Sequence, residues 1–116
     1  NKCTVQAGVE EVANRTVECL KSTVPSSVPG IAFLSGGQSS EDATANLNMM
    51  NAKYGDDLPW NLTYSYGRAL QQSALNTWLG KTENVPAAQD AFFHRAKLNG
   101  LASKGEYSES MEEVAV

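Results

Sequence analysis

Apolar positions along this chain recur with two different spacings, which predicts that helices and strands alternate. Spacings of three and four residues, typical of a helix with one buried face, run through residues 4–22, 40–54 and 68–79. A last helix begins near Pro86, a residue suited to a first helical turn, and ends near Gly105. The pattern therefore predicts helices in four stretches of the chain.

Two short runs between these helices predict β-strands. Residues 31–34 are apolar without interruption after a Pro-Gly break, as expected of a strand that is buried on both faces. Residues 62–66 are rich in β-branched and aromatic side chains. Strands that alternate with helices pair in parallel through right-handed crossovers, so the sequence predicts an α/β fold.

Two parallel strands alone cannot form a stable sheet with both faces covered, so the chain is expected to be the end of a larger domain. A (β/α)8 TIM barrel fits, because its phosphate site is typically made by the loops after its last two strands. The alternative is the tail of an open doubly wound sheet, which also binds ligands at the carboxyl ends of its strands. Residues 1–106 are assigned to this domain, and the polar residues 107–116, which lack an obvious core face, are expected to form a mobile tail.

The same spacings predict which side chains are buried. The positions expected in the core are Val5, Val9, Val12, Thr16 and Leu20 in the first helix, Ala43, Leu47, Met50 and Tyr54 in the second, Leu70, Ala74 and Trp78 in the third, and Phe92, Phe93, Ala96 and Leu98 in the last. Trp60, at a strand entrance, is also expected to pack in the core.

A glycine turn follows the first predicted strand directly. Ser35, Gly36 and Gly37 form this turn, and Ser39 with Asp42 has the capping-box spacing that begins a helix. A strand, a glycine turn and a helix N-terminus leave backbone N–H groups directed at one spot, which favours an anion such as phosphate. The alternative interpretation is that the two glycines only make a tight turn.

The second strand also ends in a glycine turn that runs straight into a helix. Ser65, Gly67 and Arg68 lie at this junction. A cation at the start of a helix is disfavoured by the helix dipole unless an anion lies nearby, and arginine can hold phosphate oxygens with two parallel hydrogen bonds. The alternative is that Arg68 is a solvated surface arginine.

Composition narrows the function further. The 116 residues carry a formal net charge of −4, which argues against a nucleic-acid or anionic-membrane partner, and no apolar run reaches the roughly 20 residues that cross a bilayer. Cys3 and Cys19 are read as reduced thiols of a cytoplasmic protein, and no ligand cluster suggests a metal. His94, the only histidine, is expected to be structural or on the surface.

Beyond these general features, long motifs closely resemble those of class I fructose-1,6-bisphosphate aldolase. The resemblance covers most of the chain, from residue 23 to residue 107. Its motifs are Phe33 to Ser39, Asn46 to Asn48, Pro59 with Trp60, Leu62 to Gln71, Ser73 to Leu75, Trp78, Gly80 with Lys81, Glu83 with Asn84, Ala88 with Gln89, Arg95 with Ala96, Leu101 with Ala102, Gly105 and Tyr107.

The resemblance implies a glycolytic lyase with a TIM barrel, of which this chain would be the sixth helix, strands seven and eight with their helices, and the final helix. Such enzymes are usually homotetramers, need no metal and cleave fructose 1,6-bisphosphate into dihydroxyacetone phosphate and glyceraldehyde 3-phosphate. Their Schiff-base lysine and acid/base residues would lie upstream of Asn1, so the chain alone is expected to be inactive. The last residues, 112–116, do not include the tyrosine with which family tails commonly end.

Position by position, the resemblance implies that Ser35, Gly36 and Gly67 bind the phosphate of the dihydroxyacetone phosphate half. Arg68 would bind substrate phosphate, and Ser65 would line the same pocket. The alternatives are a non-catalytic aldolase-like scaffold, with cytoskeletal proteins as partners, and another barrel enzyme that acts on a sugar phosphate.

Overall fold

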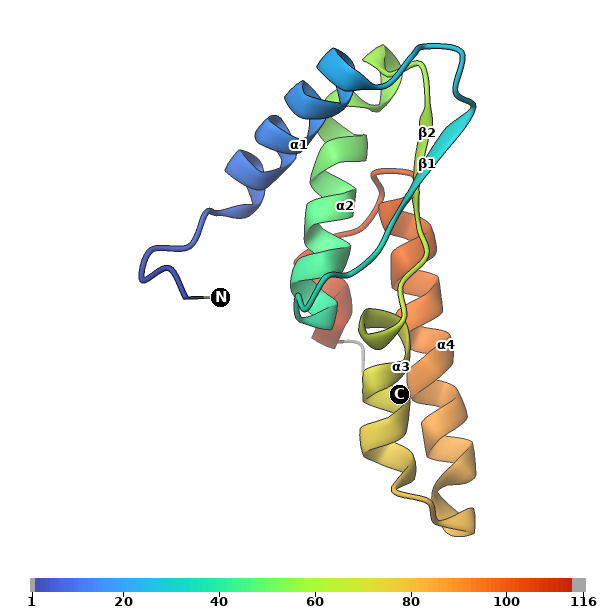
Figure 1. The fold of residues 1–116 in the computed structure, drawn as a ribbon. Helices are drawn as coiled ribbons and strands as arrows, with labels where there is room; N and C mark the ends of the chain where they lie inside the picture. Colours follow the sequence, from blue (N-terminus) through green and yellow to red (C-terminus); the bar gives the residue numbers. More distant parts are fainter. Residues whose placement is uncertain (1, 114–116) are drawn as a thin grey trace.

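The structure is a computed structural model that describes residues 2–113 of the chain. In this range the helices and strands follow the predicted order, with short 3₁₀ turns at 55–57, 82–84 and 109–113. The elements are α1 (Val9–Thr23), β1 (Gly30–Phe33), α2 (Ser40–Tyr54), β2 (Asn61–Tyr64), α3 (Arg68–Trp78) and α4 (Val85–Ala102), as drawn in Figure 1.

The two strands form a parallel pair, as the alternation with helices predicted. Gly30 lies opposite Asn61 and Phe33 lies opposite Tyr64. The side chains of β1 alternate between exposed and half-buried, so the prediction of a strand buried on both faces is wrong for this chain. The reason is that β1 and β2 have only each other as neighbours among the described residues.

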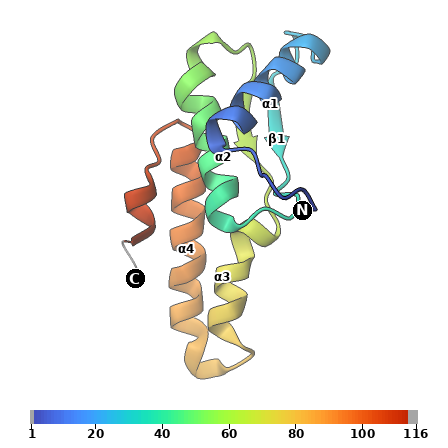
Figure 2. The same cartoon turned by 90° about the vertical axis from the view of Figure 1, so that its left-hand side faces the viewer.

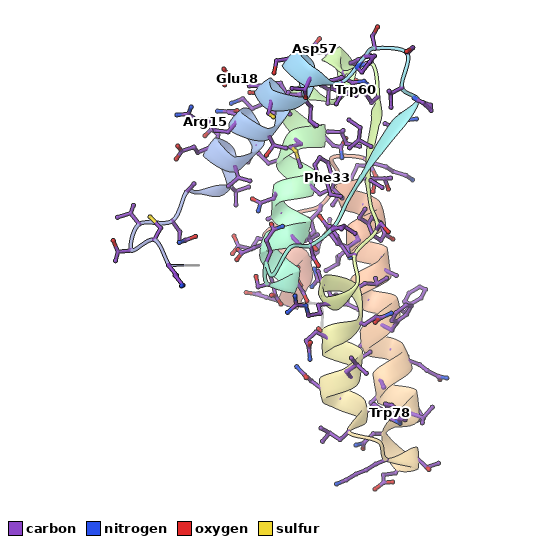
Figure 3. The ribbon with its side chains drawn as sticks, viewed as in Figure 1. Arg15, Glu18, Phe33, Asp57, Trp60 and Trp78 are labelled. Atoms are coloured by element: carbon purple, nitrogen blue, oxygen red, sulfur yellow. The ribbon has the colours of Figure 1, made fainter. Side chains whose placement is uncertain are left out.

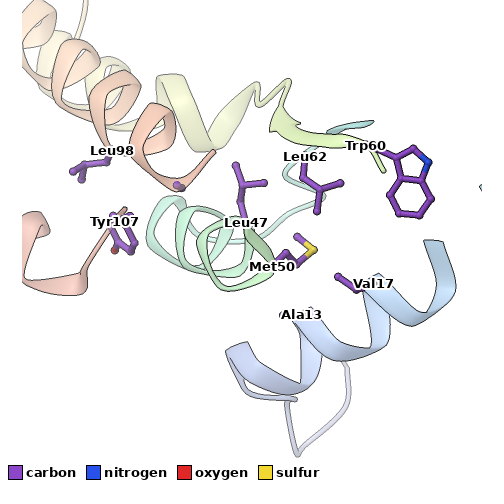
Figure 4. Packing of buried hydrophobic residues seen from close by; sticks show 9 residues of the cluster. Ala13, Val17, Leu47, Met50, Trp60, Leu62, Leu98 and Tyr107 are labelled. Atoms are coloured by element: carbon purple, nitrogen blue, oxygen red, sulfur yellow. The ribbon is translucent and has the colours of Figure 1, made fainter. Parts of the chain in front are cut away.

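Helix α2 packs against β2, and α1 packs against α2. The end of α4 also contacts β2, and α3 and α4 form an antiparallel pair that extends beyond the strands (Figures 1 and 2). The largest buried cluster joins α1, α2, α4 and β2, and Figure 4 shows Val17, Met50 and Leu62 turned toward one another. Trp60 is buried, as predicted, and its indole Nε1 donates to the Pro25 carbonyl at 2.8 Å.

One amide connects three elements of this core. The Asn51 Nδ2 group on α2 lies 3.3 Å from the Leu47 carbonyl, 3.2 Å from the Leu62 carbonyl of β2 and 3.0 Å from the Ala102 carbonyl of α4. The position of α2 relative to the strand and to the last helix is therefore set by directional bonds as well as by apolar packing.

Helix α1 begins later than predicted and buries a different face. Gly8 is extended (ψ 171°) and stands before the first helical residue, and Val5 is 81% exposed. The buried residues of α1 are Ala13 and Val17, one position round from the predicted Val12 and Thr16, which are half-buried. The small Ala13 side chain lets α1 lie close to α2.

The core faces of α3 and α4 were also predicted incorrectly in part. Leu98 is buried as expected, but Phe93 is 69% exposed and Phe92 and Trp78 are also exposed. In Figure 3 Trp78 lies near the far end of the α3–α4 pair, away from Trp60. Small side chains such as Ala69 and Ala88 occupy the buried positions instead, because two helices approach most closely where side chains are short.

Residues 107–113 do have a core face, contrary to the sequence analysis. Tyr107 is buried within the main cluster, and Met111 packs against it. Glu112 pairs with the buried Arg95 of α4, which the spacing of apolar residues could not predict. The remainder of the expected tail, residues 114–116, lies outside the described residues.

Within residues 2–113, none of the helices combines the length and the apolar character that crossing a bilayer requires.

Candidate functional site

The two glycine turns leave the sheet at the same edge. The pairing of β1 and β2 continues past the strands, because the Ser65 N–H donates to the Phe33 carbonyl at 2.7 Å. The chain therefore passes into the Ser35–Gly37 turn and into the Ser65–Gly67 turn from adjacent positions in the register.

The first turn needs its glycines for their backbone conformation. Gly36 and Gly37 have φ angles of +56° and +80°, which residues with a Cβ adopt only with strain. A Cβ at either position would meet no atom within 4 Å, so space is not the constraint. Ser35 is buried, whereas both glycines are exposed.

Helix α2 begins at the predicted position and with the predicted cap. The Ser39 hydroxyl accepts a hydrogen bond from the Asp42 N–H at 3.0 Å, which confirms the N-cap. Glu41 and Asp42 lie in the first turn, where negative charge complements the helix dipole. The same carboxylates would repel an anion at the N-terminus of α2. An anion bound there would therefore depend on hydrogen bonds from the backbone N–H groups of the glycine turn.

The second turn presents an arginine to solvent. Ser65, Gly67 and Arg68 are all exposed, and α3 begins at Arg68 as predicted. The Gly67 carbonyl accepts from the N–H groups of Leu70 and Gln71, at 3.1 and 3.0 Å. Of the carboxylates in the described residues, none lies within ion-pair distance of Arg68, so its guanidinium has all its donors available for a ligand.

A hollow of about 530 Å³ lies beside the first turn. Its lining includes Gly36, Gly37, Gln38, Asp42 and Asn46, together with residues 6–9. Ser65, Gly67 and Arg68 are not among its lining residues. The strand register thus brings the two turns to one edge, but they do not share a cavity among the described residues.

Sequence reasoning missed two polar side chains that hold the first turn. Gln38 Nε2 donates to the Ser35 carbonyl at 2.7 Å, and Asn46 Nδ2 donates to Gln38 Oε1 at 2.7 Å. Glutamine directly after a glycine pair was the available signal, because a long amide can fold back onto the carbonyl that precedes the turn.

A second hollow, of about 610 Å³, lies between α3, α4 and the start of α2. His94, Arg95, Asp90 and Glu112 are among the residues that line it. His94 is half-buried, as a structural role would require, and its Nε2 has no hydrogen-bond partner among the described residues. Arg95 was not identified from the sequence as a buried residue, although it shares the spacing of Ala88, Leu98 and Ala102.

The structure also places the two cysteines and the side chains that could bind a metal ion. Cys3 and Cys19 are both free and exposed. In the part of the chain from residue 2 to residue 113, no three His, Cys, Asp or Glu side chains come together in a way that could hold a metal ion.

Parallel strands separated by a helix, each followed by a glycine turn and another helix, define part of an α/β protein. In proteins of this class, ligands generally bind at the carboxyl ends of the strands. The sequence model of one family, described as fructose-bisphosphate aldolase class-I, matches residues 1–116, and the chain belongs to this family.

Relatives agree with this assignment. The chain is 56% identical to fructose-bisphosphate aldolase B of Sparus aurata over 110 residues, which is 95% of this chain and 30% of that protein. It is 60% identical to the muscle-type enzyme of Lethenteron camtschaticum over 98 residues, 84% of this chain and 27% of that protein. The chain thus spans about 30% of the length of the curated relatives it matches.

A solved structure supports the fold. The fructose-bisphosphate aldolase of Plasmodium falciparum, in a complex with TRAP and a small-molecule inhibitor, matches with a TM-score of 0.87 and 50% identity. The match covers 92% of this chain and 30% of that chain. The described elements are therefore an α/β piece of an aldolase fold.

Proposed function

We propose that residues 1–116 supply the substrate phosphate-binding loops of a class I fructose-bisphosphate aldolase. The observation that carries the proposal is the register of β1 and β2, which brings the Ser35–Gly37 and Ser65–Arg68 turns to one edge of the sheet. Family membership supplies the ligand, a sugar phosphate. In this proposal residues 1–106 are the sixth helix, strands seven and eight with their helices, and the final helix of a single (β/α)8 barrel, and residues 107–116 are its tail.

The loops would bind phosphate through donors of two kinds. The N–H groups of the exposed glycines Gly36, Gly37 and Gly67 present partial positive charge, and Arg68 adds a full positive charge at the start of α3. Ser35 and Ser65 have hydroxyl groups that can donate to remaining phosphate oxygens. Together these donors would hold the dihydroxyacetone phosphate half of the substrate in place.

The bond-breaking chemistry is assigned to residues outside this stretch. A lysine on a segment before Asn1 would form the Schiff base with the substrate ketone, and the protonated imine would withdraw electrons so that the bond between the third and fourth carbons breaks. Residues 1–116 alone are expected to catalyse nothing. The partners of this stretch would be the rest of the aldolase chain, further subunits of a homotetramer and the sugar phosphate, in the cytoplasm.

Removal of the arginine tests the phosphate assignment. In the intact protein (the natural polypeptide that contains residues 1–116), Arg68→Ala is expected to weaken binding of fructose 1,6-bisphosphate by about 2–4 kcal/mol, the scale of a charge-assisted contact. The control is Arg15→Ala, because Arg15 on α1 is also exposed and has only a 3.9 Å contact to Glu11. Equal binding constants for the two variants would reject the role of Arg68.

A second candidate function is a non-catalytic aldolase-like scaffold for other proteins, including cytoskeletal ones. The Plasmodium falciparum aldolase, whose structure includes TRAP, favours it. Borohydride reduction in the presence of dihydroxyacetone phosphate separates the two functions, because it converts a Schiff base into a permanent adduct on one lysine. We expect that adduct in the intact protein, and its absence would favour the scaffold.

A further inference from the structure

The Ser35–Gly37 turn is held by side chains that the phosphate proposal does not use. The Ser35 carbonyl accepts two hydrogen bonds, one from the Gln38 backbone N–H at 3.0 Å and one from Gln38 Nε2 at 2.7 Å. Gln38 Oε1 in turn accepts from Asn46 Nδ2 at 2.7 Å. The turn is therefore connected through two amides to α2.

These bonds determine which way the peptide between Ser35 and Gly36 faces. A trans peptide directs its C=O and its N–H to opposite sides, so holding the Ser35 carbonyl toward Gln38 turns the Gly36 N–H away from it. Within residues 2–113, the N–H groups of Gly36 and Gly37 donate to no backbone or side-chain acceptor. The bonds to Ser35 thus leave the Gly36 N–H free for a ligand.

Glycine makes such a restraint necessary. Gly36 and Gly37 populate positive and negative φ about equally well, so the peptide planes of this turn can rotate at little cost unless something holds them. Asn46 contributes because its donor occupies Gln38 Oε1, which leaves Gln38 Nε2 to face the Ser35 carbonyl. Asn46 is half-buried and adjacent to the buried Leu47, so it ties the turn to a fixed part of α2.

We propose that Gln38 and Asn46 are positioning residues that fix the Ser35–Gly36 peptide with its N–H directed at a phosphate oxygen of the substrate. This inference rests on the proposed function, because it assigns the same turn to phosphate. Neither side chain has to touch the reacting atoms. Their effect is to present the donor in its binding orientation before the ligand arrives, which lowers the cost of ordering the turn on binding.

Steady-state kinetics of the intact protein test this inference. Gln38→Met keeps the length of the side chain but removes the donor. We expect it to raise the KM for fructose 1,6-bisphosphate and the inhibition constant of inorganic phosphate by roughly threefold to tenfold, the size of one neutral hydrogen bond. The turnover number kcat should stay within about twofold, because a ground-state binding contact is lost and no reacting group is removed.

The chain offers a matched control for this variant. Gln72 Nε2 on α3 donates to Asn76 Oδ1 at 2.9 Å, which is the same kind of Gln–Asn contact on an exposed helix face. Gln72→Met should leave KM and the phosphate inhibition constant unchanged. If Gln38→Met does not fold, Gln38→Asn replaces it, because its amide is one methylene too short to reach Ser35 from the same backbone.

A double-mutant cycle tests whether the two amides act in series. Asn46→Leu alone should raise both KM and the inhibition constant of inorganic phosphate. The double variant Gln38→Met with Asn46→Leu should raise these two constants no further than the more impaired single variant does. Fully additive effects, or unchanged constants in both single variants, would overturn the inference. If Arg68→Ala weakens binding and Gln38→Met does not, the positioning role fails while the phosphate site remains. If neither has an effect, the phosphate site itself is rejected.

Discussion

Arg95 Nη1 of α4 lies 2.6 Å from Glu112 Oε2, and the two side chains are only 3% and 16% exposed. Arg95 also donates through Nη2 to the Ser40 carbonyl and to the Thr44 hydroxyl of α2. The other oxygen of Glu112 accepts from the Tyr107 hydroxyl at 2.9 Å. A buried positive charge is thus balanced by a carboxylate from the 3₁₀ helix at residues 109–113.

Glu112→Ala is expected to destabilise the intact protein by about 3 kcal/mol, because it leaves a buried guanidinium without its counter-charge. Urea denaturation followed by circular dichroism measures the effect. The neighbouring Glu113 is exposed, so Glu113→Ala is the control and should change the free energy of unfolding by less than about 0.5 kcal/mol. Equal effects of the two substitutions would show that the ion pair adds nothing.

Gly105→Ala is expected to destabilise the protein more than Gly80→Ala, although the two glycines have nearly the same φ, +73° and +72°. The cost of a positive φ, about 1–2 kcal/mol, applies to both. At Gly105 alone the new Cβ would lie 2.8 Å from the Ala52 backbone nitrogen, whereas at Gly80 it meets nothing within 4 Å. Thermal and urea unfolding should rank Gly105→Ala as the less stable variant by at least about 1 kcal/mol. The opposite ranking would contradict the contact between residues 105 and 52.

Stability is expected to fall between pH 10 and about pH 12 through Tyr66. Burial raises the pKa of Tyr66 to about 12, above the ordinary value near 10, and its hydroxyl donates to the Ala43 carbonyl at 2.7 Å. Below pH 10 the tyrosine is neutral in both states and the stabilisation is complete. As the pH rises, the unfolded chain loses its proton first and unfolding becomes more favourable.

Urea midpoints measured from pH 8 to pH 11.5 check this dependence. Tyr66→Phe removes the ionisable group, so the midpoint of the variant should fall less steeply with pH than that of the parent protein. Burial also raises the pKa of Tyr107, but this residue is present in both proteins and its contribution cancels in the comparison. Parallel curves would show that Tyr66 is not the group responsible.

The isolated stretch 1–116 is expected to unfold with poor cooperativity on heating. Its described sheet has two strands with open edges, and Leu79 and Phe93, 66% and 69% exposed, lie outside the core. Calorimetry should give a van't Hoff enthalpy well below the calorimetric enthalpy. A single sharp transition from a monomeric sample would contradict the idea that this stretch depends on neighbouring segments.

The order of the elements could be predicted from the sequence because each has strong local signals. The α2 boundaries follow from the Ser39 cap and the spacing of Ala43, Leu47 and Met50, and both are confirmed. The buried faces of α1 and α4 were harder to predict, because they depend on which helix lies against which. Phe92 and Phe93 fit a core pattern in the sequence, yet the structure buries Ala88 and Arg95 instead.

The candidate site could also be predicted only in part from the sequence. Both glycine turns could be located from the strand-turn-helix pattern, and the parallel register places them at one edge. The bond from Gln38 to Ser35 had one local signal, a glutamine directly after a glycine pair. The bond from Asn46 to Gln38 could not be predicted, because it depends on side-chain conformations that no periodicity encodes. The partner of Arg95 was unpredictable for a different reason: Glu112 belongs to a polar stretch with no apolar pattern.

The position of Asn51 restricts which residues can replace it. Its amide faces carbonyl oxygens from three separate elements, so an aspartate of the same size would set a negative charge against three acceptors, and a leucine would remove the side-chain donor that links them. Even a substitution that keeps the size of the side chain would therefore loosen the packing of α2 against β2 and α4. Any loosening there would spread to β2, the strand that leads into the Arg68 turn, so under the proposed function Asn51 would affect substrate affinity without contacting the substrate.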